Sequence, residues 1–174
     1  INGKTIPEEH EALDNTKKLG NMLIEPLVTL HKIKPEDVAL ENYGNPEGFL
    51  SRQLVGWHKR GVIAHGNKKS KNMEELFKIL NLQNIPEEKE FIILHNDFKL
   101  DNIILKKSLV SQKIFPQAII DWDQATRGHP LFDLATLLSY WTQKKDSSDM
   151  LLLNQMPSET TGFISRKKAL HLYE

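Results

Sequence analysis

Three short apolar runs in the second half of the chain constrain its fold more than any other feature. They are Phe91–Leu94, Ile103–Leu105 and Ala118–Ile120, and each is too short for a helix and rich in strand-forming side chains. Residues 19–30 and 131–141 instead carry apolar side chains at helical spacing. We therefore predict an α+β fold, mostly helical, in which three short buried strands form a small irregular sheet.

The expected helices are delimited by residues that favour helix starts and breaks. Pro26 lies inside the apolar stripe of residues 19–30, where we expect a kink or a break because proline lacks the N–H that a helix interior uses. The three tryptophans are expected in the core; they are Trp57, Trp122 and Trp141. The predicted helix starts are Pro7, Pro46, Asn72 with Glu75 as a capping box, Pro130 and Ser165.

Composition narrows the classes of function. The chain of 174 residues can form one domain or lobe, and its 23 basic and 23 acidic residues provide no overall attraction to nucleic acid or to an anionic membrane. The absence of cysteine excludes disulfides, thiolate zinc sites and cysteine nucleophiles, and fits the cytoplasm or another reducing intracellular compartment. No apolar run approaches the ~20 residues of a membrane span. We expect neither a nucleic-acid nor a membrane partner.

Polar side chains gather where the apolar runs end. The stretch HNDFKLDN, residues 95–102, lies between the first two runs, and Asp121 directly follows the third. Asparagine and aspartate oxygens are ligands that Mg²⁺ prefers. Magnesium-assisted phosphoryl transfer needs an Asp that orients the attacking hydroxyl, and an Asn and a second Asp that hold the metal. The H-x-D-x-x-x-x-N pattern followed by a strand-terminal Asp is the catalytic-loop signature of protein-kinase-like enzymes.

Longer stretches of the chain resemble one branch of these enzymes. The segments HNDFKLDNIIL, AIIDWDQATRGHPLFDLATLLSYW, LHKI and NPEGFLSRQLVGWHKR resemble the aminoglycoside-phosphotransferase and choline-kinase superfamily. Within it the sequence is most similar to the kinase-like domains associated with acyl-CoA dehydrogenases. The resemblance covers nearly the whole chain and is most specific over residues 95–102 and 119–135.

The resemblance implies how the chain is organised. Residues 1–174 would form the C-terminal lobe of a protein-kinase-like fold, with its last helices truncated and an N-terminal ATP-binding lobe expected in the same parent chain. Two observations support this expectation: the chain begins with Ile1 rather than Met, and its nine glycines form no G-x-G-x-x-G or G-x-x-x-x-G-K motif for a phosphate-covering loop.

The resemblance also implies roles for individual residues. Asp97 matches the catalytic Asp that accepts or orients the substrate hydroxyl proton. Asn102 and Asp121 match the Mg²⁺ ligands that hold the ATP phosphates. Lys99 lies where kinases of the serine/threonine type place a lysine near the transferred phosphate, where a cation offsets developing charge.

Other matched residues would support the site. His95 and Asp133 match buried residues that brace the catalytic loop through hydrogen bonds. Asn96 stands where this family usually has Gly, and Asn is the non-glycine residue that best tolerates a positive φ. A further matched stretch is expected to pack or to line the substrate side; it contains Arg52, Gln53 and Trp57.

The function implied is an ATP- and Mg²⁺-dependent phosphotransferase that acts on the hydroxyl of a small molecule. The acyl-CoA-dehydrogenase link favours a hydroxyacyl-CoA or a hydroxy acid. An aminoglycoside or choline-like cation is less favoured because the sequence shows no acidic pocket for it. Two alternatives remain open. One is a truncated or degenerate kinase-like lobe that serves as a non-catalytic binding module. The other is a metal-dependent hydrolase built on His95, Asp97 and Asp121, which would need further ligands at strand ends.

Overall fold

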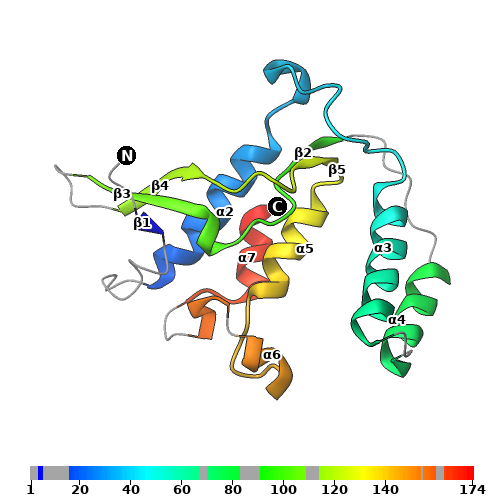
Figure 1. Ribbon diagram of the computed structural model, residues 1–174. Coiled ribbons are helices and arrows are strands. Elements are labelled where there is room, and N and C mark those ends of the chain that lie inside the picture. Colours follow the sequence, from blue (N-terminus) through cyan, green and yellow to red (C-terminus); the bar gives the residue numbers. More distant parts are fainter. Residues whose placement is uncertain are drawn as a thin grey trace.

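The computed structural model describes residues 4–5, 16–66, 70–82, 91–108, 114–153, 155–159 and 163–174. The helices in chain order are α2 (Thr16–His31), η2 (Pro35–Val38), α3 (Phe49–Ala64), α4 (Lys71–Leu82), η3 (Leu100–Asn102), α5 (Leu131–Tyr140), α6 (Ser148–Leu153), η4 (Pro157–Glu159) and α7 (Arg166–Tyr173), where η marks a 3₁₀ turn (Figure 1). The strands are β1 (Lys4–Thr5), β2 (Ile92–Leu94), β3 (Ile103–Lys107), β4 (Ile114–Ile119) and β5 (Thr126–Gly128). The α+β class is confirmed. The helix start predicted at Pro7 lies outside the described residues.

The hydrophobic core is built around α2, α5 and α7, which lie together in Figure 1. Its buried members include Leu23 and Leu27 of α2 and Leu134 and Leu137 of α5. The loop before β3 contributes as well, and Trp141 after α5 is fully buried, as predicted. None of the helices formed by the described residues is long and apolar enough to cross a membrane.

The three predicted strands are present, but they belong to two sheets rather than one. β3 and β4 pair antiparallel, with Ile103 opposite Ile119, and β1 adds to the other edge of β3. β2 pairs antiparallel with β5 instead, a strand that the apolar pattern did not predict because its sequence is Thr-Arg-Gly. β4 is also half exposed rather than buried. The loop between β2 and β3 therefore crosses from one sheet to the other.

Helices α3 and α4 form an arm that stands apart from the rest of the molecule in Figure 1. They pack on each other where Gly61 lets Met73 approach so closely that a β-carbon at position 61 would overlap the methionine sulfur. Phe49 is buried at the base of the arm, but the arm supplies no residue to the core cluster. Trp57 is 64% exposed and Trp122 is 38% exposed, so the prediction that these two tryptophans lie in the core is wrong.

The local sequence signals predicted one helix cap correctly, but another cap and a helix break wrongly. α2 continues through Pro26, so the predicted break does not occur. α4 begins at Lys71, which places Asn72 inside the first turn rather than at a capping position. Ser165 does cap α7, because its hydroxyl accepts a hydrogen bond from the N–H of Lys168 at 3.1 Å.

Candidate active site

In the loop that carries the HNDFKLDN motif, side chains alternate between the hydrophobic core and the opposite side of the backbone. Phe98 and Leu100 are fully buried in the core. The backbone at Lys99 is extended, with φ −154° and ψ 172°. In extended backbone, alternate side chains point to opposite sides. Asp97 and Lys99 therefore share the side opposite Phe98 and Leu100.

Asp97 lies at the centre of a group of hydrogen-bond donors from two parts of the chain, the motif loop and α5. The ammonium of Lys99 donates to Oδ2 of Asp97 at 2.8 Å, and Nδ2 of Asn102 donates to the same oxygen at 3.3 Å. The hydroxyl of Tyr140 donates to Oδ1 at 3.3 Å. The Asp97 side chain is 13% exposed, so it remains reachable from solvent. We call Asp97, Lys99, Asn102 and Tyr140 the Asp97 cluster.

The electrostatics of this cluster keep its donors protonated. The hydrogen bond to Asp97 raises the pKa of the Lys99 ammonium above its ordinary value, against the opposing effect of its burial. Burial raises the pKa of the Tyr140 phenol, and the charge of Asp97 adds to this effect. At neutral pH Lys99 is therefore a cation and Tyr140 a neutral donor. A carboxylate between them can accept a further hydroxyl proton from a substrate.

Asp121 lies beside the cluster through a backbone contact. The N–H of Ile120 donates to the carbonyl oxygen of Asn102 at 2.9 Å, which ties the end of β4 to the end of the motif loop. Asp121 follows at once, is exposed, and adopts a positive φ of 65°. A non-glycine residue in this left-handed region costs about 1–2 kcal/mol. Such local strain is typical of functional positions.

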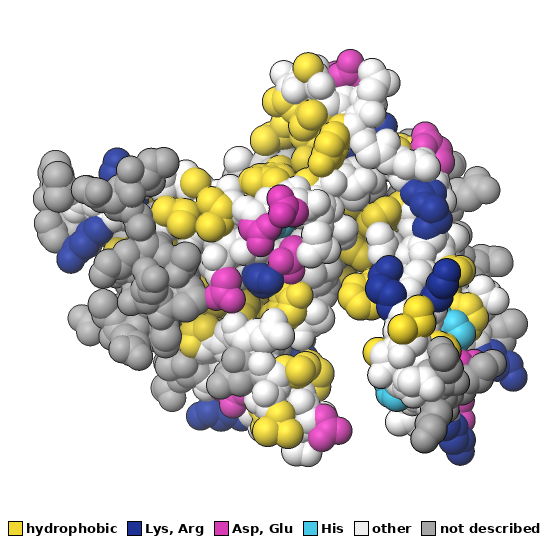
Figure 2. Space-filling view, viewed as in Figure 1, with side chains coloured by type: hydrophobic (Ala, Val, Ile, Leu, Met, Phe, Trp, Pro, Cys, Tyr) yellow, Lys and Arg dark blue, Asp and Glu magenta, His cyan; other side chains and the backbone are white. Residues whose placement is uncertain are grey.

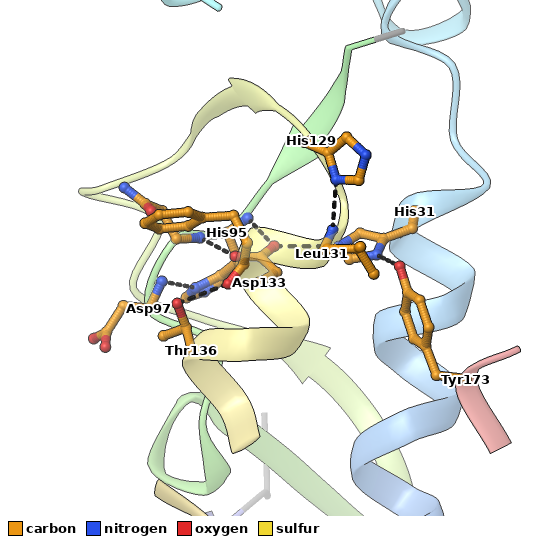
Figure 3. A network of polar contacts seen from close by, with 10 residues as sticks. His31, His95, Asp97, His129, Leu131, Asp133, Thr136 and Tyr173 are labelled. Atoms are coloured by element: carbon orange, nitrogen blue, oxygen red, sulfur yellow. Dashed lines mark hydrogen bonds and ion pairs between the residues drawn. The ribbon is translucent and has the colours of Figure 1, made fainter. Parts of the chain in front are cut away.

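Asp133 forms a second cluster beneath the loop, shown in Figure 3. Its side chain is fully buried. Oδ2 accepts the backbone N–H of His95 at 2.7 Å, and Oδ1 accepts the backbone N–H of Asn96 at 2.6 Å. The ring of His31 lies 3.3 Å from Oδ2 through Nε2. The side chain of Asp97 points away from this group in Figure 3, which agrees with separate duties for the two aspartates.

His31 and Tyr173 were not predicted to take part. The hydroxyl of Tyr173 in α7 lies 2.6 Å from Nδ1 of His31, so α7 is connected through α2 to Asp133. Burial raises the pKa of the Tyr173 phenol to about 12, with a further contribution from the Asp133 charge. The LHKI segment was part of the sequence resemblance, but nothing in its local pattern indicated a contact 102 residues away.

The loop backbone confirms one expectation about Asn96. Its φ is 67°, the left-handed region that Gly would occupy without strain. Its side-chain Nδ2 also donates to the carbonyl oxygen of Gln124 at 3.1 Å. Asn96 thus reproduces the backbone geometry that a Gly allows, and adds a contact to the loop after β4.

His95 is a structural residue, and this decides against the hydrolase alternative. The ring is fully buried; its Nε2 lies 2.9 Å from the carbonyl oxygen of Ile120, and its Nδ1 lies 3.3 Å from the N–H of Asp97. These partners make Nε2 a donor and Nδ1 an acceptor, so neither nitrogen is available to a metal ion. The described residues also contain no group of three His, Cys, Asp or Glu side chains that could hold a metal.

Asn102 and Asp121 remain suitable for Mg²⁺. Both hydrogen bonds of the Asn102 side chain leave from Nδ2, so its amide oxygen has no donor among the described residues. The carboxylate of Asp121 is exposed one residue beyond the backbone contact that joins the two segments. Two oxygen ligands fit Mg²⁺, which typically takes one or two protein groups and completes its shell with water and phosphate oxygens.

Side chains at and near α3 make two kinds of contact. Arg52 donates to the carbonyl oxygens of Asn45 and Glu47, and so stabilises the loop before α3. Arg60 lies over the exposed ring of Trp57, with the guanidinium carbon 4.3 Å from the ring centroid. Figure 2 shows a hollow between this arm and the body, with acidic and basic side chains gathered on the body beside it. Whether the arm contacts a substrate stays a prediction.

One known protein family matches this chain in sequence. The sequence profile of the phosphotransferase enzyme family matches residues 2–159. The chain belongs to this phosphotransferase family. The resemblance found in the sequence is thereby confirmed.

Similar proteins agree on the fold and on the acyl-CoA-dehydrogenase link. Acyl-CoA dehydrogenase family member 11 from Homo sapiens is 30% identical over 154 residues, which cover 86% of this chain and 18% of the relative. The Gallus gallus protein of the same name is 34% identical over 122 residues, or 69% of this chain and 15% of the relative. The chain thus spans less than a fifth of these curated relatives.

A solved structure supports the architecture. A Ralstonia eutropha protein described as a candidate aminoglycoside phosphotransferase superposes with a TM-score of 0.66 at 22% identity. The match covers 94% of this chain and 49% of that protein. It establishes the kinase-like fold.

Proposed function

We propose that this chain carries the catalytic loop of an ATP- and Mg²⁺-dependent kinase that phosphorylates the hydroxyl of a small molecule. The observation that carries the proposal is the Asp97 cluster. A reachable carboxylate is held by Lys99 and Asn102 beside the exposed Asp121, in a chain of the phosphotransferase family. These groups are the ones that phosphoryl transfer requires of a protein, because its catalysis is mainly positioning and charge stabilisation.

In the proposed reaction Asp97 accepts a hydrogen bond from the acceptor hydroxyl and orients its oxygen for in-line attack. The acceptor oxygen forms a bond to the γ-phosphorus of ATP while the bond from that phosphorus to the bridging oxygen breaks, and the electron pair leaves with ADP. The hydroxyl proton passes to Asp97 and then to solvent. Lys99, 2.8 Å from Asp97, offers a positive charge near the transferred group.

Asn102 and Asp121 would hold Mg²⁺ through the amide oxygen and the carboxylate. The bound metal would neutralise charge on the phosphates. In the proposed enzyme an N-terminal lobe of the same parent chain completes the nucleotide site.

The acceptor that we propose is a hydroxyacyl-CoA or the corresponding hydroxy acid. Support comes from the curated relatives, which are named acyl-CoA dehydrogenases and of which this chain matches one segment. A kinase segment within such a protein would act most simply on hydroxylated relatives of the same thioesters.

The first test is nucleotide binding, measured as a thermal shift with ATP in the presence and absence of Mg²⁺. It is run on the chain and on the longest reading frame that contains it, each as wild type, Asp121→Ala and Asp37→Ala. Asp37 is exposed in η2, far in sequence from the motif, and serves as the matched control. We expect Mg²⁺-dependent stabilisation in the longer protein that is lost only in Asp121→Ala.

The second test is turnover, followed as transfer of radiolabelled phosphate from ATP to hydroxybutyryl-CoA or hydroxybutyrate. Hydrolysis of ATP without an acceptor gives a rate that does not depend on the choice of acceptor. Mg²⁺-dependent nucleotide binding without either rate would favour the binding-module alternative. No response to nucleotide in the longer protein would refute the kinase proposal.

A further inference from the structure

We propose that Tyr140 is a positioning residue for phosphoryl transfer, and that its hydroxyl orients the Asp97 carboxylate toward the acceptor. The inference rests on the proposed kinase function and concerns a residue to which neither the motif nor the family resemblance assigned a role. It starts from one contact, the 3.3 Å hydrogen bond from the Tyr140 hydroxyl to Oδ1 of Asp97.

Tyr140 is placed by the helix that also braces the loop. α5 carries Asp133 in its first turn and Tyr140 as its last residue. Positions i and i+7 lie on the same face of an α-helix, about 10 Å apart along its axis. One face of α5 therefore contacts the loop twice. Asp133 holds the backbone at His95 and Asn96, and Tyr140 holds the side chain of Asp97.

The three donors to Asp97 are not equivalent. Lys99 and Asn102 both donate to Oδ2, whereas Tyr140 alone donates to Oδ1 among the described residues. The terminal torsion of an aspartate is soft, so contacts to one oxygen leave the carboxylate free to turn about that oxygen. The Tyr140 hydroxyl defines the plane of the carboxylate. It leaves the remaining lone pairs of Oδ1 for an acceptor hydroxyl.

The chemistry of Tyr140 suits this role. Its phenol stays protonated at neutral pH, because burial and the nearby Asp97 charge both favour the neutral form. The Lys99 ammonium lies 5.9 Å from the centroid of the Tyr140 ring, so the ring also faces the cation. A distance of 3.3 Å is long for an O–H···O bond, and catalytic hydrogen bonds often tighten only when substrate is bound.

The test compares Tyr140→Phe with wild type in the longest reading frame, using hydroxybutyryl-CoA transfer and acceptor-free ATP hydrolysis. Phenylalanine keeps the ring and its packing and removes only the hydroxyl. We expect kcat to fall about tenfold with KM for ATP unchanged, because a misoriented base affects the chemical step rather than nucleotide binding. Tyr43→Phe, at an exposed tyrosine outside the cluster, is the matched control and should leave both parameters unchanged.

A double-variant cycle separates positioning from general structure. If Tyr140 acts through Asp97, the Tyr140→Phe change should alter the residual rate of Asp97→Asn by less than about twofold. The contact itself is measured without activity, because Asp97→Asn should lower the pKa of the Tyr140 phenol in a spectrophotometric titration.

The outcomes are distinguishable. An unchanged kcat in Tyr140→Phe, or an equal loss in the Asp97→Asn background, overturns the inference while the kinase function stands. A wild-type protein that shows neither transfer nor hydrolysis overturns the proposed function and the inference together. A phenol titration that ignores Asp97→Asn shows that the contact does not exist in solution, which also overturns the inference.

Discussion

Asp97 and Asp133 each have three hydrogen-bonding partners, but Asp97 is partly exposed to solvent whereas Asp133 is fully buried. Asp97 accepts from the side chains of Lys99, Asn102 and Tyr140 and remains 13% exposed. Asp133 is fully buried and accepts two backbone N–H groups within 2.7 Å. A carboxylate held by movable side chains at the surface can exchange a partner for a substrate. A carboxylate that accepts hydrogen bonds from buried backbone N–H groups cannot exchange these partners without loss of structure.

In the proposed kinase the two aspartates have different roles, because a positioning group and a reactive group require different surroundings. Short, buried contacts to the backbone give rigidity, since an unsatisfied buried N–H is costly. Reachable oxygen atoms give reactivity. Substitutions can remove the rigid backbone contacts and the reachable oxygen atoms separately.

The largest effect is expected from Asp97→Asn. The amide keeps the size of the side chain but cannot accept the hydroxyl proton, so the rate of phosphoryl transfer should fall by about 10²–10⁴-fold. Stability should change by less than about 1 kcal/mol, because the ion pair with Lys99 is near the surface. Initial rates and urea unfolding measure the two quantities. A variant that loses several kcal/mol of unfolding free energy, about as much as a buried charged partner contributes, but keeps the wild-type rate would reverse the assignment of the two aspartates.

Asp133→Ala should show the opposite pattern in stability. The change leaves the backbone N–H groups of His95 and Asn96 without an acceptor in a buried place, and removes the partner of His31. The free energy of unfolding should fall by roughly 3 kcal/mol or more. Asp97→Ala is the matched control. Equal losses in the two variants would show that burial does not distinguish the aspartates.

Substitutions at Asn96 sharpen the role of the loop backbone between them. Asn96→Ala forces an alanine to a φ of 67° and removes the contact to Gln124, so it should cost about 1–2 kcal/mol. Asn96→Gly restores backbone freedom and should be within about 1 kcal/mol of wild type. Urea unfolding of the pair gives the difference. An alanine variant as stable as the glycine variant would mean that the loop does not hold this conformation in solution.

Tyr173 tests the outer end of the Asp133 group, with the smallest expected effect. Tyr173→Phe removes one hydrogen bond to His31 and should cost about 1 kcal/mol. The folded state raises the pKa of this phenol to about 12, from an ordinary value of about 10. The stabilisation it provides is therefore fully present below pH ~10 and is lost as the pH rises toward 12.

Tyrosinate absorbance during an alkaline titration measures this directly. The pKa of the Tyr140 phenol is raised as well, so the late-titrating component should lose the amplitude of one tyrosine in Tyr173→Phe, while Tyr43→Phe should retain it in full. A wild-type titration curve that Tyr173→Phe leaves unchanged would show that the phenol is not buried beside His31.

Much of the site could be predicted because its signals are local. Asp97, Lys99 and Asn102 lie within one loop, and the alternation of polar and apolar side chains orders them. The positive φ of Asn96 was expected because the family usually has Gly at this position and Asn tolerates that region best, and Ser165 caps α7 through a residue three positions away. The predicted capping box at Asn72 is wrong because α4 begins at Lys71, so that Asn72 lies inside the helix and not at the capping position.

Local side-chain patterns were enough to predict the α+β class, the three short strands and the loop that carries Asp97 and Asn102, because these features depend on neighbours in the chain. The pairing of the strands, the exposure of Trp57 and the distant groups around the two aspartates follow instead from how the elements pack in three dimensions. His31 meets Asp133 across 102 residues and Tyr140 meets Asp97 across 43. Such contacts are selected by the packing of α2, α5 and α7 around one core, and no local spacing encodes them.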